Sequence, residues 1–265
     1  MPIFSTVALG FILLFSFVFP LFYSVDASGF DAKSILLPPS FEHLLGTDRL
    51  GRDLLSRVMQ GGQTSLIIGF SSSFIATAIA VIYGISAALL KGGYDRVFVV
   101  VVDLFLTFPT LFLLLALVSY MNASIWVLIA IISITGWMGT ARLIRSQSFE
   151  IGSKPYIKIL HIAKISKIKI MLKYYIPLLA PIVLVSFTFG VSGAILAESA
   201  LSFLGLGITP PQFSWGSILS DGKEVIDIAW WVSFFPGLLI FIVTLSLINI
   251  SNYLQNRLVK KELHS

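Results

Sequence analysis

Residues 137–181 read WMGTARLIRSQSFEIGSKPYIKILHIAKISKIKIMLKYYIPLLAP and form one long polar segment between apolar runs. The segment holds eight of the 18 Lys and Arg residues of the chain and a single acid, Glu150. Basic loops of membrane proteins stay on the cytoplasmic side, so this segment is predicted to be cytoplasmic. The eight cations are Arg142, Arg145, Lys154, Lys158, Lys164, Lys167, Lys169 and Lys173.

The first half of this segment has the pattern of a short amphipathic helix. If residues 154–164 are helical, Lys154, Lys158 and His161 share one face, because they are spaced by four and three residues. The opposite face is then apolar, and it consists of Ile159, Leu160, Ile162 and Ala163.

The helical pattern stops near Ile165 and then starts again. Lys167 and Lys169 would fall on opposite faces of one continuous helix, whereas a new helix places Lys169 and Lys173 on the same side. We therefore expect two short helices with a bend near Ile165 and Ser166. An apolar face outside the membrane must be covered by the bilayer surface or by a partner protein. The simpler alternative is that the lysines only fix the topology.

The composition is that of a polytopic membrane protein. Of its 265 residues, 57% are hydrophobic and 12% are charged, whereas roughly a quarter are charged in soluble domains. The length accommodates about six helical spans of roughly 20 residues, which predicts a single membrane domain over residues 1–265. The net charge of +5 does not indicate nucleic-acid binding, because no soluble domain is predicted to carry a basic face. The chain contains no cysteine, which excludes disulfides and thiolate metal sites.

Six apolar runs are predicted to cross the bilayer. The first run is followed by Val25, Asp26 and Ala27, a sequence that is also compatible with signal-peptidase cleavage. We favour a retained anchor, because the run is longer than the core of a usual signal peptide and no basic residue precedes it. The predicted spans are residues 3–23, 66–90, 97–119, 125–139, 177–197 and 230–250.

The distribution of charge predicts the topology. Thirteen cations lie in the segments assigned to the inside and five in those assigned to the outside. Both chain ends are therefore expected in the cytoplasm, together with a cytoplasmic loop at 140–176. The outer loops are expected at 24–65 and 198–229.

The third predicted span contains an acid and a proline. Pro109 is expected to kink this helix, because proline removes a backbone hydrogen bond. Asp103 is a candidate pathway residue, because an acid inside a membrane is costly and is usually functional. It also lies close enough to the cytoplasmic end of the span to reach water or Arg96, so we favour a structural role.

Residues 43–57, HLLGTDRLGRDLLSR, resemble the LGTDxLGRDxxSR segment of permease subunits of ATP-binding-cassette importers. The resemblance is to the second permease of the dipeptide, oligopeptide and nickel systems, and it covers nearly the whole chain. It implies an all-α fold of the type I importer permease class with about six transmembrane helices. Further motifs occur in the family's order: Asp95, Asp103 and Phe108-Pro109, then Ala141-Arg142 with Arg145, then LSFLGLG at 201–207 with Pro211 and Trp215-Gly216.

In that family, the cytoplasmic loop contains a short coupling helix that docks into a groove of the ATPase subunit. By position, Tyr156 and Ile157 match the start of this helix, and Ile176-Pro177 resembles its closing Leu-Pro. The resemblance therefore implies a set of ATPase-coupling residues, which are Tyr156, Lys158, Ile159, Leu160, Ala163, Lys164, Ile165, Ser166 and Pro177.

The interior of this loop departs from the family's pattern. Lys158 stands where the family usually has Glu, and Ile159 and Leu160 stand where it has two alanines. Lys164 replaces the glycine at the bend and lacks the freedom of glycine at positive φ. These departures leave the expected fold unchanged and affect the details of ATPase docking.

The chain is predicted to be a permease and not an enzyme, with no catalytic or metal site. It lacks a GxxxxGK[ST] phosphate-binding loop, so it is expected to bind no cofactor itself, and ATP would be hydrolysed by partner subunits. The resemblance implies a multi-pass protein of the bacterial cytoplasmic (inner) membrane, surrounded by lipid and without a nucleic-acid partner. Its implied partners are a homologous second permease, two ATP-binding-cassette ATPases and an extracytoplasmic substrate-binding protein.

Two other classes of function fit the sequence less well than a permease does. A membrane enzyme needs ionisable groups gathered near one membrane face, but His43, His161 and His264 fall in three different segments. An ion-coupled carrier needs acids or broken helices at mid-membrane, and only Asp103 hints at this. The substrate remains open between peptides and nickel or metal chelates. The short chain slightly favours the metal-type members, whereas no cluster of His or Met lines a predicted span.

Overall fold

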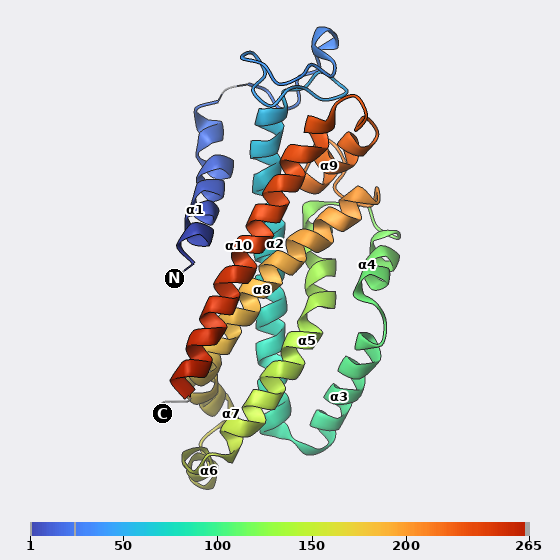
Figure 1. Ribbon diagram of the computed structural model, residues 1–265. Coiled ribbons are helices and arrows are strands. Elements are labelled where there is room, and N and C mark those ends of the chain that lie inside the picture. The colour runs from blue at the N-terminus through green and yellow to red at the C-terminus, as the bar shows by residue number, and fades with distance from the viewer. Residues whose placement is uncertain (1, 24, 263–265) are drawn as a thin grey trace.

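The computed structural model describes residues 2–23 and 25–262, with the side chains of His161 and of residues 258–262 excluded. This part of the chain is an all-α bundle without β-strands (Figure 1). Short 3₁₀ turns lie at Phe19–Leu21 and Ala32–Ser34, and a π-helical turn at Met171–Tyr175 leads into α8. The α-helices are α1 (Ile3–Phe17), α2 (Leu54–Leu90), α3 (Gly92–Leu106), α4 (Thr110–Val118), α5 (Ile125–Ser153), α6 (Pro155–Ile162), α7 (Lys167–Ile170), α8 (Ile176–Phe203), α9 (Trp215–Lys223) and α10 (Trp230–Glu262).

The membrane-spanning character of the bundle agrees with the sequence-based expectation. In the described residues, five helical segments are long and apolar enough to cross a bilayer, and α3 with α4 makes a sixth if the two count as one span. The prediction of a helical polytopic fold is therefore confirmed.

The third predicted span is broken and not merely kinked. Helix α3 ends at Leu106, α4 begins at Thr110, and the two axes differ by 83°. Pro109 precedes the first residue of α4 instead of lying mid-helix. Proline has no backbone N–H and disfavours helical geometry at the residue before it, here Phe108, so the chain leaves the helix at this dipeptide.

Several helices extend well beyond the predicted spans. Helix α2 begins at Leu54, where the Asp53 side chain accepts a hydrogen bond from the backbone N–H of Ser56, so residues 54–65 are helix and not loop. Its 37 residues correspond to about 55 Å, against a hydrocarbon thickness of about 30 Å. Helix α5 likewise continues to Ser153, through the first third of the predicted loop 140–176. Helix α8 continues to Phe203, and α9 occupies part of the predicted loop 198–229.

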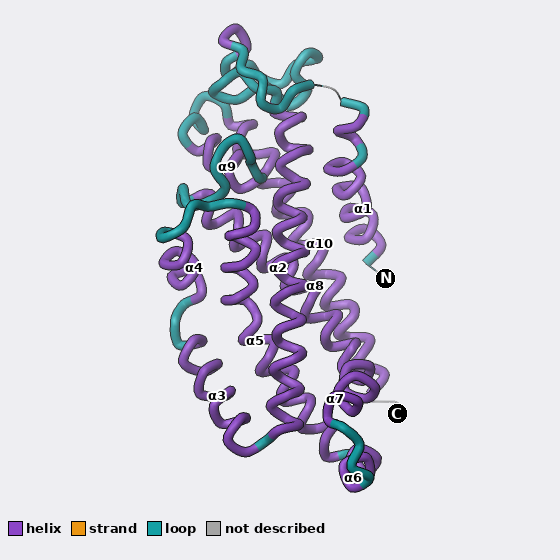
Figure 2. The backbone as a smooth tube through the Cα atoms, turned by 180° about the vertical axis from the view of Figure 1, so that it is seen from behind, coloured by secondary structure: helices purple, strands orange, loops and turns teal. Residues whose placement is uncertain are grey.

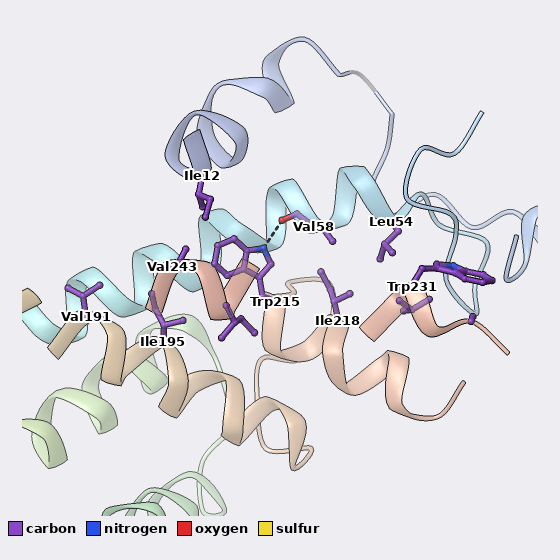
Figure 3. Close-up of a cluster of buried hydrophobic side chains, with 12 residues drawn as sticks. Ile12, Leu54, Val58, Val191, Ile195, Trp215, Ile218, Trp231 and Val243 are labelled. Atoms are coloured by element: carbon purple, nitrogen blue, oxygen red, sulfur yellow. Dashed lines mark hydrogen bonds between the residues drawn. The ribbon is translucent and has the colours of Figure 1, made fainter. Parts of the chain in front are cut away.

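Helix α2 runs through the middle of the bundle and packs against α5 and α8 (Figures 1 and 2). Two glycines allow close approach on its N-terminal half. A Cβ at Gly62 would come within 2.7 Å of the Trp215 ring, and one at Gly69 within 2.5 Å of Ile195. Trp215 is fully buried, and its Nε1 donates a 2.8 Å hydrogen bond to the Val58 carbonyl (Figure 3). The first turn of α9 is thereby fixed against α2.

The two ends of the bundle differ in architecture. The loop before α2 and helix α9 lie together at one end, whereas α6, α7 and the turn between α2 and α3 lie at the other (Figure 1). The C-terminal end of α10 lies on the side of α6 and α7 (Figure 1). Most of the basic segment is thus gathered at one end, as expected if that end is cytoplasmic.

Candidate functional site

The basic segment folds into a small tip made of α6, α7 and the π-helical turn. Ile157 of α6 is fully buried, and it belongs to one apolar cluster with Ile144 of α5, Ile170 of α7 and Tyr175 of the π turn. This cluster also includes Ile85 of α2. Because these side chains come from five elements, the tip is held rigidly on the ends of the long helices.

Several large apolar side chains of the tip are exposed. Ile162 is 80% exposed and Ile159 is 62% exposed. Leu160 does not share this surface, because it is half-buried and packs against the apolar cluster below α6. The expectation that Ile159 and Leu160 form one open face is therefore wrong. We call the exposed set the apolar ridge, and it consists of Tyr156, Ile159, Ile162, Ile168 and Leu172.

The predicted bend lies where the sequence placed it, and it has a specific geometry. The backbone N–H of Ile165 donates to the Leu160 carbonyl at 3.2 Å, which is the hydrogen bond of a Schellman cap at the end of α6. Lys164 occupies the left-handed position of this cap with φ of 54°. Glycine fits this position without strain, which gives a physical reason for the glycine of the family's pattern at the place where this chain has Lys164.

The remaining residues predicted to couple to the ATPase lie before and after the bend. Ser166 caps α7 by accepting a hydrogen bond from the Lys169 backbone N–H at 3.4 Å. Pro177 is the second residue of α8 and follows the π-helical turn directly. Lys158 and Ala163 are exposed, and Ile165 is half-buried. The His161 side chain lies outside the described residues.

Two ion pairs join α3 to α5. Arg145 contacts Asp95 through two hydrogen bonds, Nε to Oδ1 at 2.5 Å and Nη2 to Oδ2 at 2.7 Å. Arg142 pairs with Asp103, and both side chains are about half exposed. Asp103 therefore takes its cation from α5 and not from Arg96 as the sequence suggested. The two acids and the two arginines of the recognised motifs are thus the partners of one another.

At the opposite end, the 43–57 motif forms a network of ion pairs with α9. Asp48 is almost fully buried and accepts a 2.7 Å hydrogen bond from Arg52 Nε. The carboxylate of Asp221 in α9 accepts hydrogen bonds from Arg57 Nη2 at 3.4 Å and from Arg49 Nη2 at 3.3 Å. Sequence reasoning did not find Asp221, because it lies more than 160 residues from its partners. This network fastens the outer loop onto α9.

Sequence reasoning also did not find a second acid, which is buried. Glu198 of α8 is fully buried and accepts hydrogen bonds from Ser202 Oγ at 2.7 Å, Ser214 Oγ at 2.6 Å and Ser65 Oγ at 3.3 Å. Ser214 also caps α9, and Ser65 accepts from the backbone N–H of Trp215 at 3.1 Å. The only sequence signal was a lone acid at the end of an apolar run. Glu198 ties α2, α8 and α9 together.

The described residues hold no group of three or more His, Asp or Glu side chains placed to bind a metal ion. His43 lies beside Asp53, with Nδ1 3.0 Å from Oδ2, close to the start of α2. His264 lies outside the described residues. The structure thus defines a helical membrane protein with an anchored basic tip at one end. At the other end, the loop before α2 is held to α9 by ion pairs.

Comparison with known proteins gives the family. Residues 80–261 match the family described as the inner membrane component of binding-protein-dependent transport systems. The oligopeptide transport system permease protein OppC of Haemophilus influenzae is 34% identical over 235 residues, which cover 88% of this chain and 76% of that protein. The dipeptide transport system permease protein DppC of Bacillus subtilis is 34% identical over 237 residues, 87% of this chain and 73% of that protein.

The same relationship holds across distant bacteria. OppC of Mycobacterium tuberculosis strain H37Rv is 34% identical over 224 residues, which cover 83% of this chain and 76% of that protein. This chain belongs to the family of inner membrane components of binding-protein-dependent transport systems. It is a multi-pass bacterial inner membrane permease and not an enzyme, as the sequence predicted.

Proposed function

We propose that this chain is one of the two permeases of a peptide importer and forms half of its translocation pathway. The three relatives described above are named for oligopeptide or dipeptide transport, which favours peptides over nickel. The second half of the pathway would come from a homologous permease, and substrate would be delivered by an extracytoplasmic binding protein. ATP would be hydrolysed by two separate ATPase subunits, so this chain would bind no cofactor itself.

The observation that carries the coupling role is the apolar ridge on an anchored tip. Ile159 and Ile162 project outward, while Ile157 fixes the same helix to the bundle. An exposed apolar surface surrounded by lysines fits a groove of a partner protein that is apolar in its centre and acidic at its rim. A short rigid helix clamped in such a groove transmits motion between two rigid bodies.

Replacement of Ile162 tests this coupling. Ile162→Asp would bury an unpaired carboxylate in the ATPase groove, so copurification of the ATPase and peptide uptake should both fall by about tenfold or more, or about 1.4 kcal/mol. Membrane insertion should not change, because the residue is exposed at the tip. Ile162→Val keeps the apolar contact, and Lys154→Ala removes an exposed charge at the junction of α5 and α6, so both should behave as the unmodified protein.

Two outcomes contradict separate parts of the proposal. If Ile162→Asp is present in the membrane and retains full uptake and ATPase association, the ridge is not the coupling surface. The substrate is tested in a deletion strain with labelled dipeptides, labelled tripeptides and labelled nickel. Nickel uptake that depends on this chain, without peptide uptake, would contradict the peptide assignment.

A further inference from the structure

A partly open cavity of about 230 Å³ lies between α2, α4, α5 and α8. Its lining is uncharged and consists mostly of small residues: seven of its fifteen residues are Ser or Thr, and six are Gly or Ala. The hydroxyl residues come from all four helices and include Ser73, Thr77, Thr110, Thr135, Thr140 and Ser186.

The cavity lies at mid-length of the long helices. Ser72 is the central residue of α2, 18 positions from both Leu54 and Leu90. Gly190 lies close to the centre of α8, and Thr140 close to the centre of α5. No charged residue occurs in α2 between Arg57 and Lys91, so this part of the helix is the part that crosses the hydrocarbon layer. The cavity-lining hydroxyl groups of α2 and α8 are therefore placed deep in the membrane, whereas Thr140 of α5 lies two residues before Arg142 and closer to the tip.

A neighbouring groove shows how different this lining is. The groove between α2 and α8 that includes Phe70, Phe74 and Phe187 is almost entirely apolar, as expected for a surface covered by lipid or by another helix. Thr77 lies between the two, because it lines both the groove and the cavity, and it is only 8% exposed and makes no side-chain hydrogen bond to the rest of the described chain. Polar groups at this depth are costly unless they meet water or a polar ligand.

The chemistry of the lining selects a class of ligand. The hydroxyl groups of Ser72, Ser73 and Thr135 already donate to backbone carbonyls of this chain. The remaining four, on Thr77, Thr110, Thr140 and Ser186, make no hydrogen bond within the described residues and can both donate and accept. A peptide presents an N–H and a C=O at nearly every residue. Among the described residues that line the cavity, none is His, Met, Asp or Glu, so the wall offers no good ligand for a transition metal. The uncharged wall also binds weakly, which a conducting path requires because the ligand must leave again.

We propose that this hydroxyl-lined cavity is this chain's wall of the translocation pathway and that it hydrogen-bonds to the backbone of the passing peptide. The inference rests on the proposed function, because the second permease must close the other side. Recognition of the backbone alone accommodates peptides with different side chains. The small lining residues leave room for those side chains.

Gly193 provides a direct test, because it lines the cavity and a Cβ there would meet no atom within 4 Å. The Cβ of Gly193→Leu therefore meets no atom of this chain, and the rest of the leucine side chain extends into the cavity. In the complete importer reconstituted in proteoliposomes, with binding protein present, it should reduce peptide uptake by about tenfold or more. ATPase association should remain normal. Gly193→Ala and Gly10→Leu are matched controls, since Gly10 of α1 also faces open space away from the cavity, and both should transport normally.

Cysteine labelling provides a second measurement in this cysteine-free chain. Thr77→Cys and Thr140→Cys should react with a small water-soluble methanethiosulfonate during turnover, and transported peptide should slow the reaction. Ser192→Cys should not react, because Ser192 is buried outside the cavity and donates to the Phe189 carbonyl. The labelled position is identified by mass spectrometry.

The results separate this inference from the proposed function. If the unmodified complex transports peptides and Gly193→Leu transports them equally well, the cavity is not the pathway. If the unmodified complex transports no peptide at all, the proposed function is contradicted. If Gly193→Leu fails to assemble, the labelling decides. Unreactive Thr77→Cys and Thr140→Cys would then identify the lining as a helix-packing surface and overturn the inference.

Discussion

Arg145 and Asp95 lie 50 positions apart in the chain and join α5 to α3 through two hydrogen bonds of 2.5 and 2.7 Å. The second pair between these helices, Arg142 with Asp103, is more exposed. Together, the pairs fix the broken α3–α4 unit to the helix that leads into the tip. Motion of the tip would therefore be transmitted to α3 through these side chains.

Asp95→Ala should destabilise the α3–α5 contact by about 1–3 kcal/mol, because it removes a bidentate charge-assisted pair that is largely shielded from water. Thermal unfolding of the purified complex measures the effect. Exchange of the two residues, Asp95→Arg with Arg145→Asp, should restore part of the loss. Asp103→Ala is the matched control and should cost less, because its pair is exposed and screened. Equal losses in the two single variants would contradict this assignment.

Lys164→Gly should stabilise the tip. Lys164 holds the left-handed position of the cap at φ of 54°, which costs a non-glycine residue about 1 kcal/mol. Hydrogen exchange of residues 155–170 should become slower, and Lys164→Val should accelerate it because a β-branched side chain fits this conformation poorly. Lys167→Gly is the control, because it lies inside α7 and should only weaken that helix. Faster exchange in Lys164→Gly would show that the charge of Lys164 matters more than its backbone.

Lys158→Glu should weaken docking of the partner ATPase. Lys158 is exposed next to Ile159 of the apolar ridge, so it is placed to meet an acid at the rim of the groove. A glutamate would meet that acid as a like charge, and the loss should diminish as ionic strength rises. Copurification at two salt concentrations measures this. Stronger docking of Lys158→Glu would indicate a basic groove of the usual family type.

Residues 24–53 and α9 should face the outside, and the tip should face the cytoplasm. Ser153 and Asp227 are exposed, so single cysteines at these positions can be labelled. Ser214 is unsuitable, because it is buried against Glu198. An impermeant thiol reagent applied to spheroplasts should label Asp227→Cys and not Ser153→Cys. The reverse pattern would invert the topology.

Local patterns in the sequence were enough to predict the apolar core of five spans, the two tip helices and the bend near Ile165, but not the break of the third span between Leu106 and Thr110. Hydropathy and helical periodicity report which residues share a face over a few turns. They do not report which face meets another helix, so Leu160 was grouped with Ile159 although it packs inward. Asp221 and Glu198 were missed for the same reason, since their partners are distant in sequence and only packing brings them together.

Glu198→Ala should loosen the contact of α9 with α2 and α8 and destabilise the protein by about 2 kcal/mol or more. The substitution leaves the hydroxyl groups of Ser65, Ser202 and Ser214 buried without their common acceptor. Glu198→Gln keeps the size and one acceptor oxygen, so its effect should be smaller.

The expected signature is local as well as global. Amides of residues 214–223 should exchange faster in Glu198→Ala, because Ser214 loses the bond that anchors the start of α9. Glu150→Gln removes an exposed acid and should leave both measurements unchanged. An unfolding temperature of Glu198→Ala equal to that of the unmodified protein would show that the serine hydroxyls find other acceptors and that Glu198 does not hold the three helices together.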